Sequence, residues 1–414
     1  MRISTRTTAV ASSFAALTAV AFWAARREAA ANPPAPMELE VRNLDIAFYE
    51  GRAARDTLGA ADRARLAALY LQRARETGDY EDFRRSERAA RGALALRTAH
   101  NTQTTLVLAS SLLAQHRFPE SLAETRALVD ARPDVPAYRA LLGELQLEMG
   151  DYDAARVTFA SLARHARDLA VASRLARWAE IRGRTADARW ILMRAVADTR
   201  ARTDLPREQV AWFHLRLGDL ELRNGRFDRA EAAFEAGLEA NPDDYRIIAA
   251  TARLAAERRR WRETISLARR LGDRADIATL ALAGDASAAL GDTAAAERWY
   301  ARAERQGREN PEPFNRQWTL YRLDHRRHLD ETLAILRDEI RVRRDVYGYD
   351  QLAWALYRVG SYAAAREAME RALRMGTQDA MLFRHAGLIE QALGAPERAR
   401  HFLDRAERVK SGGL

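Results

Sequence analysis

The stretch that decides the fold is "LRLGDLELRNGRFDRAEAAFEAGLEANPDD", residues 215–244. At helical spacing it carries one apolar stripe before Gly225 and a second one between Gly225 and Pro242. Gly225 tolerates the positive φ that ends many helices, and Pro242 cannot continue a helix. The stretch therefore predicts two short helices joined by a tight turn.

Small residues within this stretch indicate that the two helices pack closely. Gly218, Ala230 and Gly237 have almost no side chain, so the backbones can approach each other while Phe234 fills the remaining gap. The stretch contains no Cys, His or Ser, which makes it a poor candidate for catalysis or metal binding. A single helical hairpin leaves one apolar face uncovered, so the chain should contain further copies on which it can stack.

Copies of the pattern occur along most of the chain. In "YRALLGELQLEMGDYDAARVTFASL", residues 138–162, Gly143 and Phe159 stand where the first stretch has Gly218 and Phe234. A similar copy is "FRHAGLIEQALGAPERARHFLDRA", residues 383–406. The copies begin near residues 64, 102, 136, 169, 211, 245, 277, 313, 346 and 380.

This pattern resembles the tetratricopeptide repeat family, whose unit is a helical hairpin with small residues at its eighth, twentieth and twenty-seventh places. The resemblance covers about residues 60–409. It implies an all-α fold, a right-handed α-solenoid of about ten hairpins in which each unit contacts mainly its neighbours.

The sequence departs from the family pattern at three joints. Arg259 and Arg327 stand where glycine is usual at the turn, so these joints are expected to bend. The fourth and fifth units are spaced more widely, with "DTRARTDLPREQV", residues 198–210, as an extra loop or a lengthened helix.

The charge of the chain raises a nucleic-acid hypothesis. The net charge is +9 and the isoelectric point about 10.1. Lys410 is the only lysine, so 66 of the 67 basic residues are Arg, and the basic runs are interleaved with acids. This pattern is typical of solvated helix faces. An Arg-rich module that binds nucleic acid or acts in regulation in the cytoplasm is kept as the alternative function.

The first 37 residues carry the pattern of an export segment. Arg2 and Arg6 precede an uncharged run over residues 7–25, and "AAAN" is a candidate cleavage site. Residues 1–31 are therefore predicted to be a signal peptide or a signal anchor, with residues 7–25 as the membrane tether. The repeats would then lie in the periplasm or on the extracytoplasmic face of the membrane, which suits a chain without Cys.

The two ends of the repeat region are predicted to differ. Residues 32–37 form a Pro-rich spacer, and residues 38–59 a capping helix that covers the first hairpin. Residues 410–414 form a flexible tail without a further capping helix. That end is expected to dock on a partner or on another copy of the chain, so self-association stays open.

One short segment resembles a metal site. "DHRRHLDE", residues 324–331, has two His three residues apart and three acids, but it falls at a turn that is normally wet. The chain has no "HExxH", no Gly-rich phosphate loop with Lys and no "GxSxG". The prediction is a non-enzymatic protein without metal or cofactor.

The resemblance implies that the first helix of each hairpin lines a concave groove. Tyr, Trp and Arg anchor partners because they bury a large area and still present a polar tip. The places that point inward are Trp212, Arg223, Arg253, Phe314, Tyr321, Asp324, Tyr347, Asp350, Trp354, Tyr357, Arg358 and Arg384. We expect a scaffold that binds a peptide or protein partner there and supports assembly of an envelope or periplasmic complex. The competing interpretation is that some of these aromatics only pack between hairpins.

Overall fold

The computed structural model describes residues 38–309 and 314–412. These residues form 21 α-helices, α2 to α22, and two short 3-10 helices. The chain divides into two units, residues 1–48 and residues 49–414, and α2 (Glu38–Arg55) crosses the division. The capping role of this helix stays a prediction.

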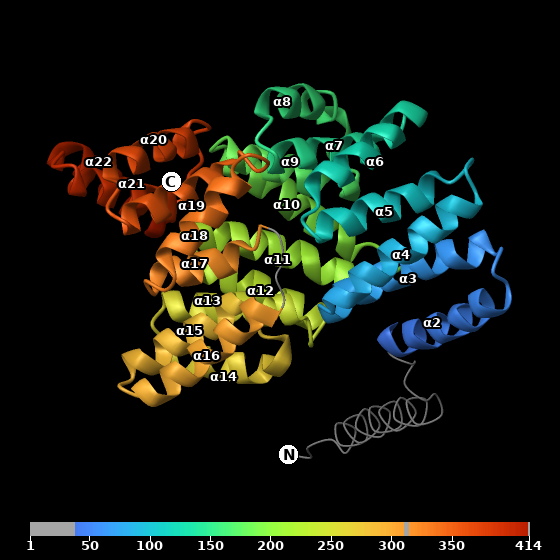
Figure 1. Cartoon of the computed structure of the whole chain (residues 1–414), viewed down its shortest axis with the longest axis horizontal. Coiled ribbons are helices and arrows are strands. Elements are labelled where there is room, and N and C mark those ends of the chain that lie inside the picture. Colours follow the sequence, from blue (N-terminus) through green and yellow to red (C-terminus); the bar gives the residue numbers. More distant parts are fainter. Residues whose placement is uncertain (1–37, 310–313, 413–414) are drawn as a thin grey trace, which may run out of the picture. The chain divides into compact units, whose positions relative to one another are not determined.

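The helices from α3 onward form ten consecutive hairpins, which confirms the predicted all-α solenoid (Figure 1). The first five are α3 (Ala60–Thr77) with α4 (Tyr80–Leu96), α5 (Thr102–Ala114) with α6 (Phe118–Ala131), α7 (Pro136–Glu148) with α8 (Tyr152–Ala160), α9 (Leu169–Ile181) with α10 (Thr185–Arg200), and α11 (Arg207–Arg223) with α12 (Phe227–Ala240). The last five are α13 (Tyr245–Glu257) with α14 (Trp261–Leu271), α15 (Ile277–Ala289) with α16 (Thr293–Glu309), α17 (Arg316–Asp324) with α18 (Leu329–Glu339), α19 (Val346–Arg358) with α20 (Tyr362–Leu373), and α21 (Ala380–Ala392) with α22 (Pro396–Lys410).

The fifth hairpin, α11 with α12, packs as its sequence predicts. The ring of Phe234 is 1% exposed and lies so close to Gly218 that a Cβ there would approach it to under 3.0 Å. Gly143 and Phe159 repeat this contact in the third hairpin, where the added Cβ would lie 2.7 Å from the ring. The small residue of the first helix therefore makes room for the large residue of the second.

Three hairpin turns use a non-glycine residue in the left-handed region, and in the second hairpin this residue is His116, with φ +57. Arg259 has φ +56, as its place in the pattern predicts. In the eighth hairpin the left-handed residues are Arg326 and His328 rather than Arg327, because α17 ends at Asp324. A residue with a side chain adopts this left-handed conformation at a cost of roughly 1–2 kcal/mol.

The wide spacing between the fourth and fifth hairpins comes from longer helices. Helix α10 has 16 residues and α11 has 17, and residues 201–206 connect them. Of the two alternatives for this segment, the structure contains lengthened helices with a short connection.

Hairpins 8–10 pack against hairpins 3–5. The sequence analysis did not predict this contact, because it expected each hairpin to contact mainly its neighbours in the chain. In Figure 1 the orange helix α19 lies beside the green helices α9 and α10, and Val346 and Leu382 share a buried cluster with Phe159. We call this contact the seam. It joins three glycine turns to three backbone segments that lie on them: Gly150 with Arg344, Gly183 with Gly376, and Gly225 with Lys410.

Hydrogen bonds and ion pairs cross the seam. The Val346 backbone N–H donates to the Tyr152 hydroxyl at 2.7 Å, and the Thr377 hydroxyl donates to the carbonyl of Ile181 at 2.5 Å. Arg343 Nη2 lies 3.0 Å from Glu148 Oε2. The seam forms because a glycine turn has no side chain to hold a second backbone away.

The end of α22 also lies on the seam. Val409 is 1% exposed, and Lys410 Nζ lies 3.0 Å from Glu257 Oε2 at the end of α13. The end that was expected to dock on a partner or another copy therefore contacts the middle hairpins of its own chain. Lys410 itself, predicted to begin a flexible tail, is the last residue of α22.

Candidate partner-binding site

The twelve residues predicted to line a groove fall into separate groups, and the largest lies on hairpins 8–10. Helices α17, α19 and α21 are the first helices of these hairpins, and neighbouring ones pack side by side. We call this group, with one residue that the sequence did not single out, the C-terminal cluster. Its members are Asp324, Asp350, Trp354, Tyr357, Arg358, Arg384 and His385.

A stack of aromatic rings forms the buried centre of the C-terminal cluster, where Trp354 is 6% exposed and belongs to the core between hairpins. The Trp354 ring stacks with Tyr357, with centroids 4.9 Å apart, and with His385, with centroids 4.1 Å apart. The guanidinium of Arg358 lies 4.6 Å from the Trp354 ring centroid, within cation–π range. Trp354 Nε1 donates to Asp324 Oδ1 at 2.9 Å, which fixes the ring across two hairpins.

His385 is the member of the C-terminal cluster that the sequence analysis missed. Its Nδ1 lies 2.8 Å from Asp350 Oδ1, and both side chains are buried. This bond ties α19 to α21 and holds the imidazole against Trp354. A single sequence gives no sign that this His differs from any other on a helix face.

Three arginines surround the exposed side of the C-terminal cluster, one from each hairpin: Arg326, Arg358 and Arg384. Burial, together with Arg326 and Arg384, lowers the pKa of Arg358 below its ordinary value, although Asp324 opposes the shift. Within residues 38–309 and 314–412, no carboxylate lies within ion-pair distance of Arg326 or Arg384, and both are exposed. The exposed carboxylate of Asp324 offsets part of the charge of the three arginines, so the surface carries a net positive charge.

Tyr321 and Tyr347 are buried in the structure. Tyr321 is 3% exposed and Tyr347 is 4% exposed. The Tyr347 ring lies in the seam, where the guanidinium groups of Arg177 and Arg316 approach its centroid to 5.5 and 4.2 Å. Burial, helped by Asp379, raises the pKa of Tyr347 to about 12. A partner has no access to either ring in this arrangement.

Arg223 and Arg253 form ion pairs between consecutive hairpins. Arg223 Nε donates to Glu180 Oε1 at 2.7 Å, and Arg253 Nη2 donates to Asp219 Oδ1 at 3.0 Å. Trp212 is half-buried, with its ring edge-on to Phe213. These three residues lie apart from the C-terminal cluster, on α11 and α13.

Phe314 precedes helix α17 instead of lying within it. Its backbone is left-handed, with φ +56, and its ring packs 5.5 Å from that of Phe118 in the second hairpin. Helix α17 begins later because Asn315 caps it, accepting the Trp318 backbone N–H at 3.1 Å. The repeat alignment placed the start of this unit a few residues too early.

The segment 324–331 does not gather its His and acidic residues. His325 Nε2 lies 2.9 Å from Asp285 Oδ1 of hairpin 7, whereas His328 lies 3.8 Å from Glu331. Burial opposes protonation of His325, but its bonds with Asp285 and the Tyr321 carbonyl raise its pKa. Across the described part of the chain, no group of three His, Cys, Asp or Glu side chains is placed to hold a metal ion.

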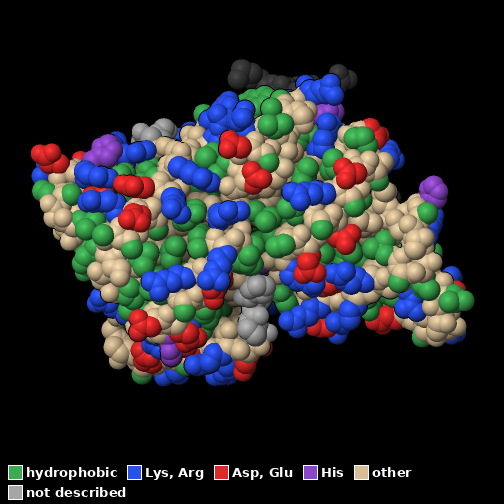
Figure 2. All heavy atoms as spheres, turned by 45° about the horizontal axis from the view of Figure 1, so that its top comes forward, with side chains coloured by type: hydrophobic (Ala, Val, Ile, Leu, Met, Phe, Trp, Pro, Cys, Tyr) green, Lys and Arg blue, Asp and Glu red, His purple; other side chains and the backbone are tan. Residues whose placement is uncertain are grey.

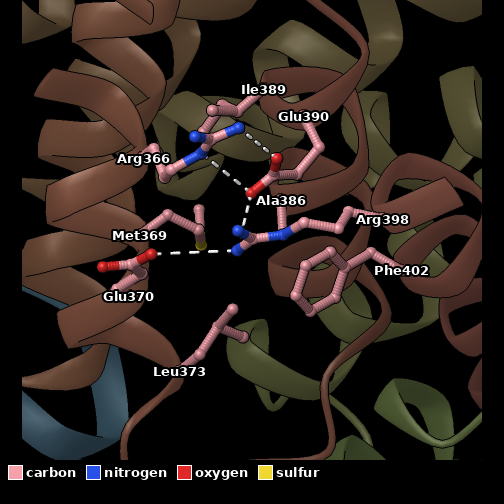
Figure 3. Close-up of a pocket in the computed structure, with 9 residues that line it drawn as sticks. All are labelled: Arg366, Met369, Glu370, Leu373, Ala386, Ile389, Glu390, Arg398 and Phe402. Atoms are coloured by element: carbon pink, nitrogen blue, oxygen red, sulfur yellow. Dashed lines mark hydrogen bonds and ion pairs between the residues drawn. The ribbon is translucent and has the colours of Figure 1, made fainter. Parts of the chain in front are cut away.

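A small pocket between the last two hairpins is filled by ion pairs. Arg366 donates to both Glu390 oxygens, at 3.1 and 2.5 Å, and Arg398 also contacts Glu390 at 3.0 Å (Figure 3). The remaining cavity is about 10 Å³, which is room for about one water. This pocket joins α20, α21 and α22 and offers no room for a ligand.

The outer surface shows no continuous basic stripe on the face drawn in Figure 2. Basic and acidic side chains alternate there, with hydrophobic ones between them. Among helices α2 to α22, none has the length and hydropathy to cross a membrane. The predicted signal or anchor (1–31), its run 7–25 and the spacer 32–37 lie outside the described residues.

Ten stacked hairpins with an aromatic and basic cluster define the class of this protein, an α-helical repeat scaffold. Models of the tetratricopeptide repeat match residues 106–170, 211–255 and 351–412. The chain therefore contains tetratricopeptide repeats in these stretches. Such proteins are usually non-catalytic scaffolds that bind protein partners.

Solved structures also resemble the chain. A tetratricopeptide repeat protein from Parabacteroides merdae is 14% identical, with a TM-score of 0.41, over 62% of this chain and 98% of that one. The Cut9–Hcn1 hetero-tetramer of the APC/C contains a chain that is 12% identical, with a TM-score of 0.34, over 89% of this chain and 87% of that one. No curated protein matches the sequence.

Proposed function

We propose that the protein is a scaffold that binds an acidic segment of a protein partner over the C-terminal cluster. The observation that carries this proposal is the row of Arg326, Arg358 and Arg384, one per hairpin, beside an aromatic stack. Arginine binds carboxylates through paired hydrogen bonds. Arg358 Nη2 donates to the Asp324 carbonyl at 2.8 Å, which holds the guanidinium at the edge of the aromatic stack.

The aromatic residues of the same surface provide an apolar contact for the partner. Tyr357 is half-buried, and its ring lies 5.7 Å from that of Tyr362, which is 38% exposed. Both rings add area at a small entropy cost, while the neighbouring arginines supply charge. A segment that alternates acidic and apolar side chains matches this arrangement.

A photo-crosslinking experiment tests the proposed surface. We expect a photoreactive Phe analogue at Tyr362 to capture a specific partner in the native host, whereas the same group at Trp190, an exposed residue of α10, should not. Arg358→Gln combined with Arg384→Gln should reduce capture at residue 362 about tenfold or more, because two charge-assisted hydrogen bonds are lost.

The matched control for the double variant is Arg229→Gln, which changes an exposed arginine of α12 outside the cluster. Circular dichroism should show the same helicity for all variants. Equal capture at residues 190 and 362, or capture that survives the loss of Arg358 and Arg384, would refute the proposed surface.

We also propose that the protein acts outside the cytoplasm, supporting assembly of an envelope or periplasmic complex. The support is the sequence of residues 1–31, with its two arginines before an uncharged run, and the absence of Cys from the chain. Cell fractionation with mass spectrometry of the N-terminal peptide tests this. Recovery of the protein from the cytoplasm with an intact N-terminus would contradict it.

A further inference from the structure

The seam contains a pocket of about 380 Å³ beside Gly150, which is open to solvent. Helices α6 and α7 line one side, and the residues before α19 and after α20 line the other. This volume lies in the range of small-molecule sites. We call it the seam pocket, and it is separate from the C-terminal cluster.

Three arginines from different elements line the seam pocket. Arg126 lies on α6, Arg344 precedes α19, and Arg374 follows α20. Arg374 Nη2 donates to the Gly150 carbonyl at 3.1 Å, and its guanidinium lies over the Tyr152 ring. In the part of the chain that the structure describes, neither Arg126 nor Arg344 has a carboxylate within ion-pair distance.

Asp151 is the one acidic residue that lines the seam pocket. Its carboxylate accepts the Ala154 backbone N–H at 3.2 Å and so caps α8, which gives it a structural role of its own. The lining therefore carries three positive charges against one negative charge. An anion can supply the missing charge and receive paired hydrogen bonds from the guanidinium groups.

The inner wall of the seam pocket combines apolar surface with polar groups. Leu122 and Tyr349 are each 8% exposed, and Gln146 is 9% exposed. The Gln146 Oε1 accepts the Thr158 hydroxyl at 2.8 Å, which holds this side chain in the wall. Such a wall suits a ligand with a compact organic body in addition to its charged group.

We propose that the seam pocket binds a small organic anion, a compact molecule that carries carboxylate or phosphoryl groups. Its anionic oxygens would bridge Arg126 of the second hairpin and Arg344 before the ninth. Because the ligand contacts both sides of the seam, its binding stabilises the packing of hairpins 8–10 on hairpins 3–5.

Titration calorimetry with citrate and with inorganic phosphate tests this proposal. We expect saturable binding with one site per chain and an affinity that falls as salt is added. Arg126→Gln and Arg344→Gln should each weaken binding about tenfold, and Arg229→Gln should leave it unchanged. A preference for citrate identifies a carboxylate ligand, whereas a preference for phosphate identifies a phosphoryl ligand.

Hydrogen exchange gives a second readout at the seam. The Val346 amide, which donates to Tyr152, should exchange more slowly when the anion is bound. The proposal is overturned if neither anion shows saturable binding up to about 10 mM, a concentration above a millimolar dissociation constant. It is also overturned if Arg229→Gln weakens binding as much as the two pocket variants do.

Discussion

Seven hairpin turns have a glycine in one backbone conformation, and apart from Gly78, which lies beside the Tyr245 ring, they form two groups of three that differ in their surroundings. All have a φ between +67° and +85°. Three of them lie in the seam, where an added Cβ would approach a backbone carbonyl to well under 3.0 Å: Gly150, Gly183 and Gly225. The other three have nothing within 4 Å of that position: Gly291, Gly360 and Gly394. The same left-handed glycine turn therefore carries a long-range contact at the three seam positions and none at the other three.

The largest effect is expected from alanine at a seam glycine. Gly150→Ala and Gly360→Ala share the strain of a left-handed Ala, roughly 1–2 kcal/mol. Gly150→Ala should lose about 2–3 kcal/mol more, because its methyl group collides with the Arg344 carbonyl. Urea unfolding of the two variants measures the difference, and equal losses would mean that the seam is not packed as described.

An intermediate effect is expected from the charged contact of the seam. Arg343→Gln removes the closer of the two arginine partners of Glu148, leaving Arg177 at 3.6 Å, and should cost about 2 kcal/mol, since a partly buried carboxylate loses a charged hydrogen bond. The control is Arg341→Gln, whose pair with Asp338 is exposed and should contribute under about 0.5 kcal/mol. Thermal unfolding of both variants tests this, and a larger loss for the control would contradict it.

A smaller loss of stability is expected when the Tyr152 hydroxyl is removed. Tyr152→Phe leaves the buried Val346 N–H without an acceptor, at a cost of about 1 kcal/mol. Tyr362→Phe, at the exposed first residue of α20, should change the free energy of unfolding by less than about 0.5 kcal/mol. Faster hydrogen exchange at Val346 in Tyr152→Phe alone is the expected signature, and unchanged exchange there would count against the bond.

The smallest effect is expected outside the seam, between hairpins 7 and 8. The pKa of His325 is raised, so its bond with Asp285 adds stability below the unfolded pKa near 6.5 and loses it as pH rises through the folded pKa. Asp285→Asn should lower the His325 pKa and flatten this dependence. NMR titration of the imidazole measures it, and an unshifted pKa in the variant would exclude the bond.

The hairpins could be predicted from the sequence because their determinants are local and repeated. The pairing of Gly218 with Phe234 recurs as Gly143 with Phe159, and each pair lies within one hairpin. The seam could not be predicted, because Gly150 and Gly360 look identical in sequence. They differ because the backbone of Arg344, nearly 200 residues further along the chain, packs on the Gly150 turn, whereas nothing packs on the Gly360 turn.

The candidate site could be predicted in part. The family spacing placed Trp354, Tyr357 and Arg358 on one face, and they do lie together. It also included Tyr347, which is buried because hairpin 9 packs in the seam. His385 was missed since its role depends on a partner, Asp350, from the preceding hairpin.

The central claim, that the last hairpins lie on the middle ones, can be tested through the single lysine of the chain. Lys410 lies on the Gly225 turn of the seam, and its Nζ lies 3.0 Å from Glu257 Oε2 in the adjoining hairpin 6. Carbodiimide coupling followed by mass spectrometry of the monomer should yield a Lys410–Glu257 amide bond, which Glu257→Gln abolishes. Lys410 coupled only to acids of its own hairpin, or to another copy of the chain, would contradict the account.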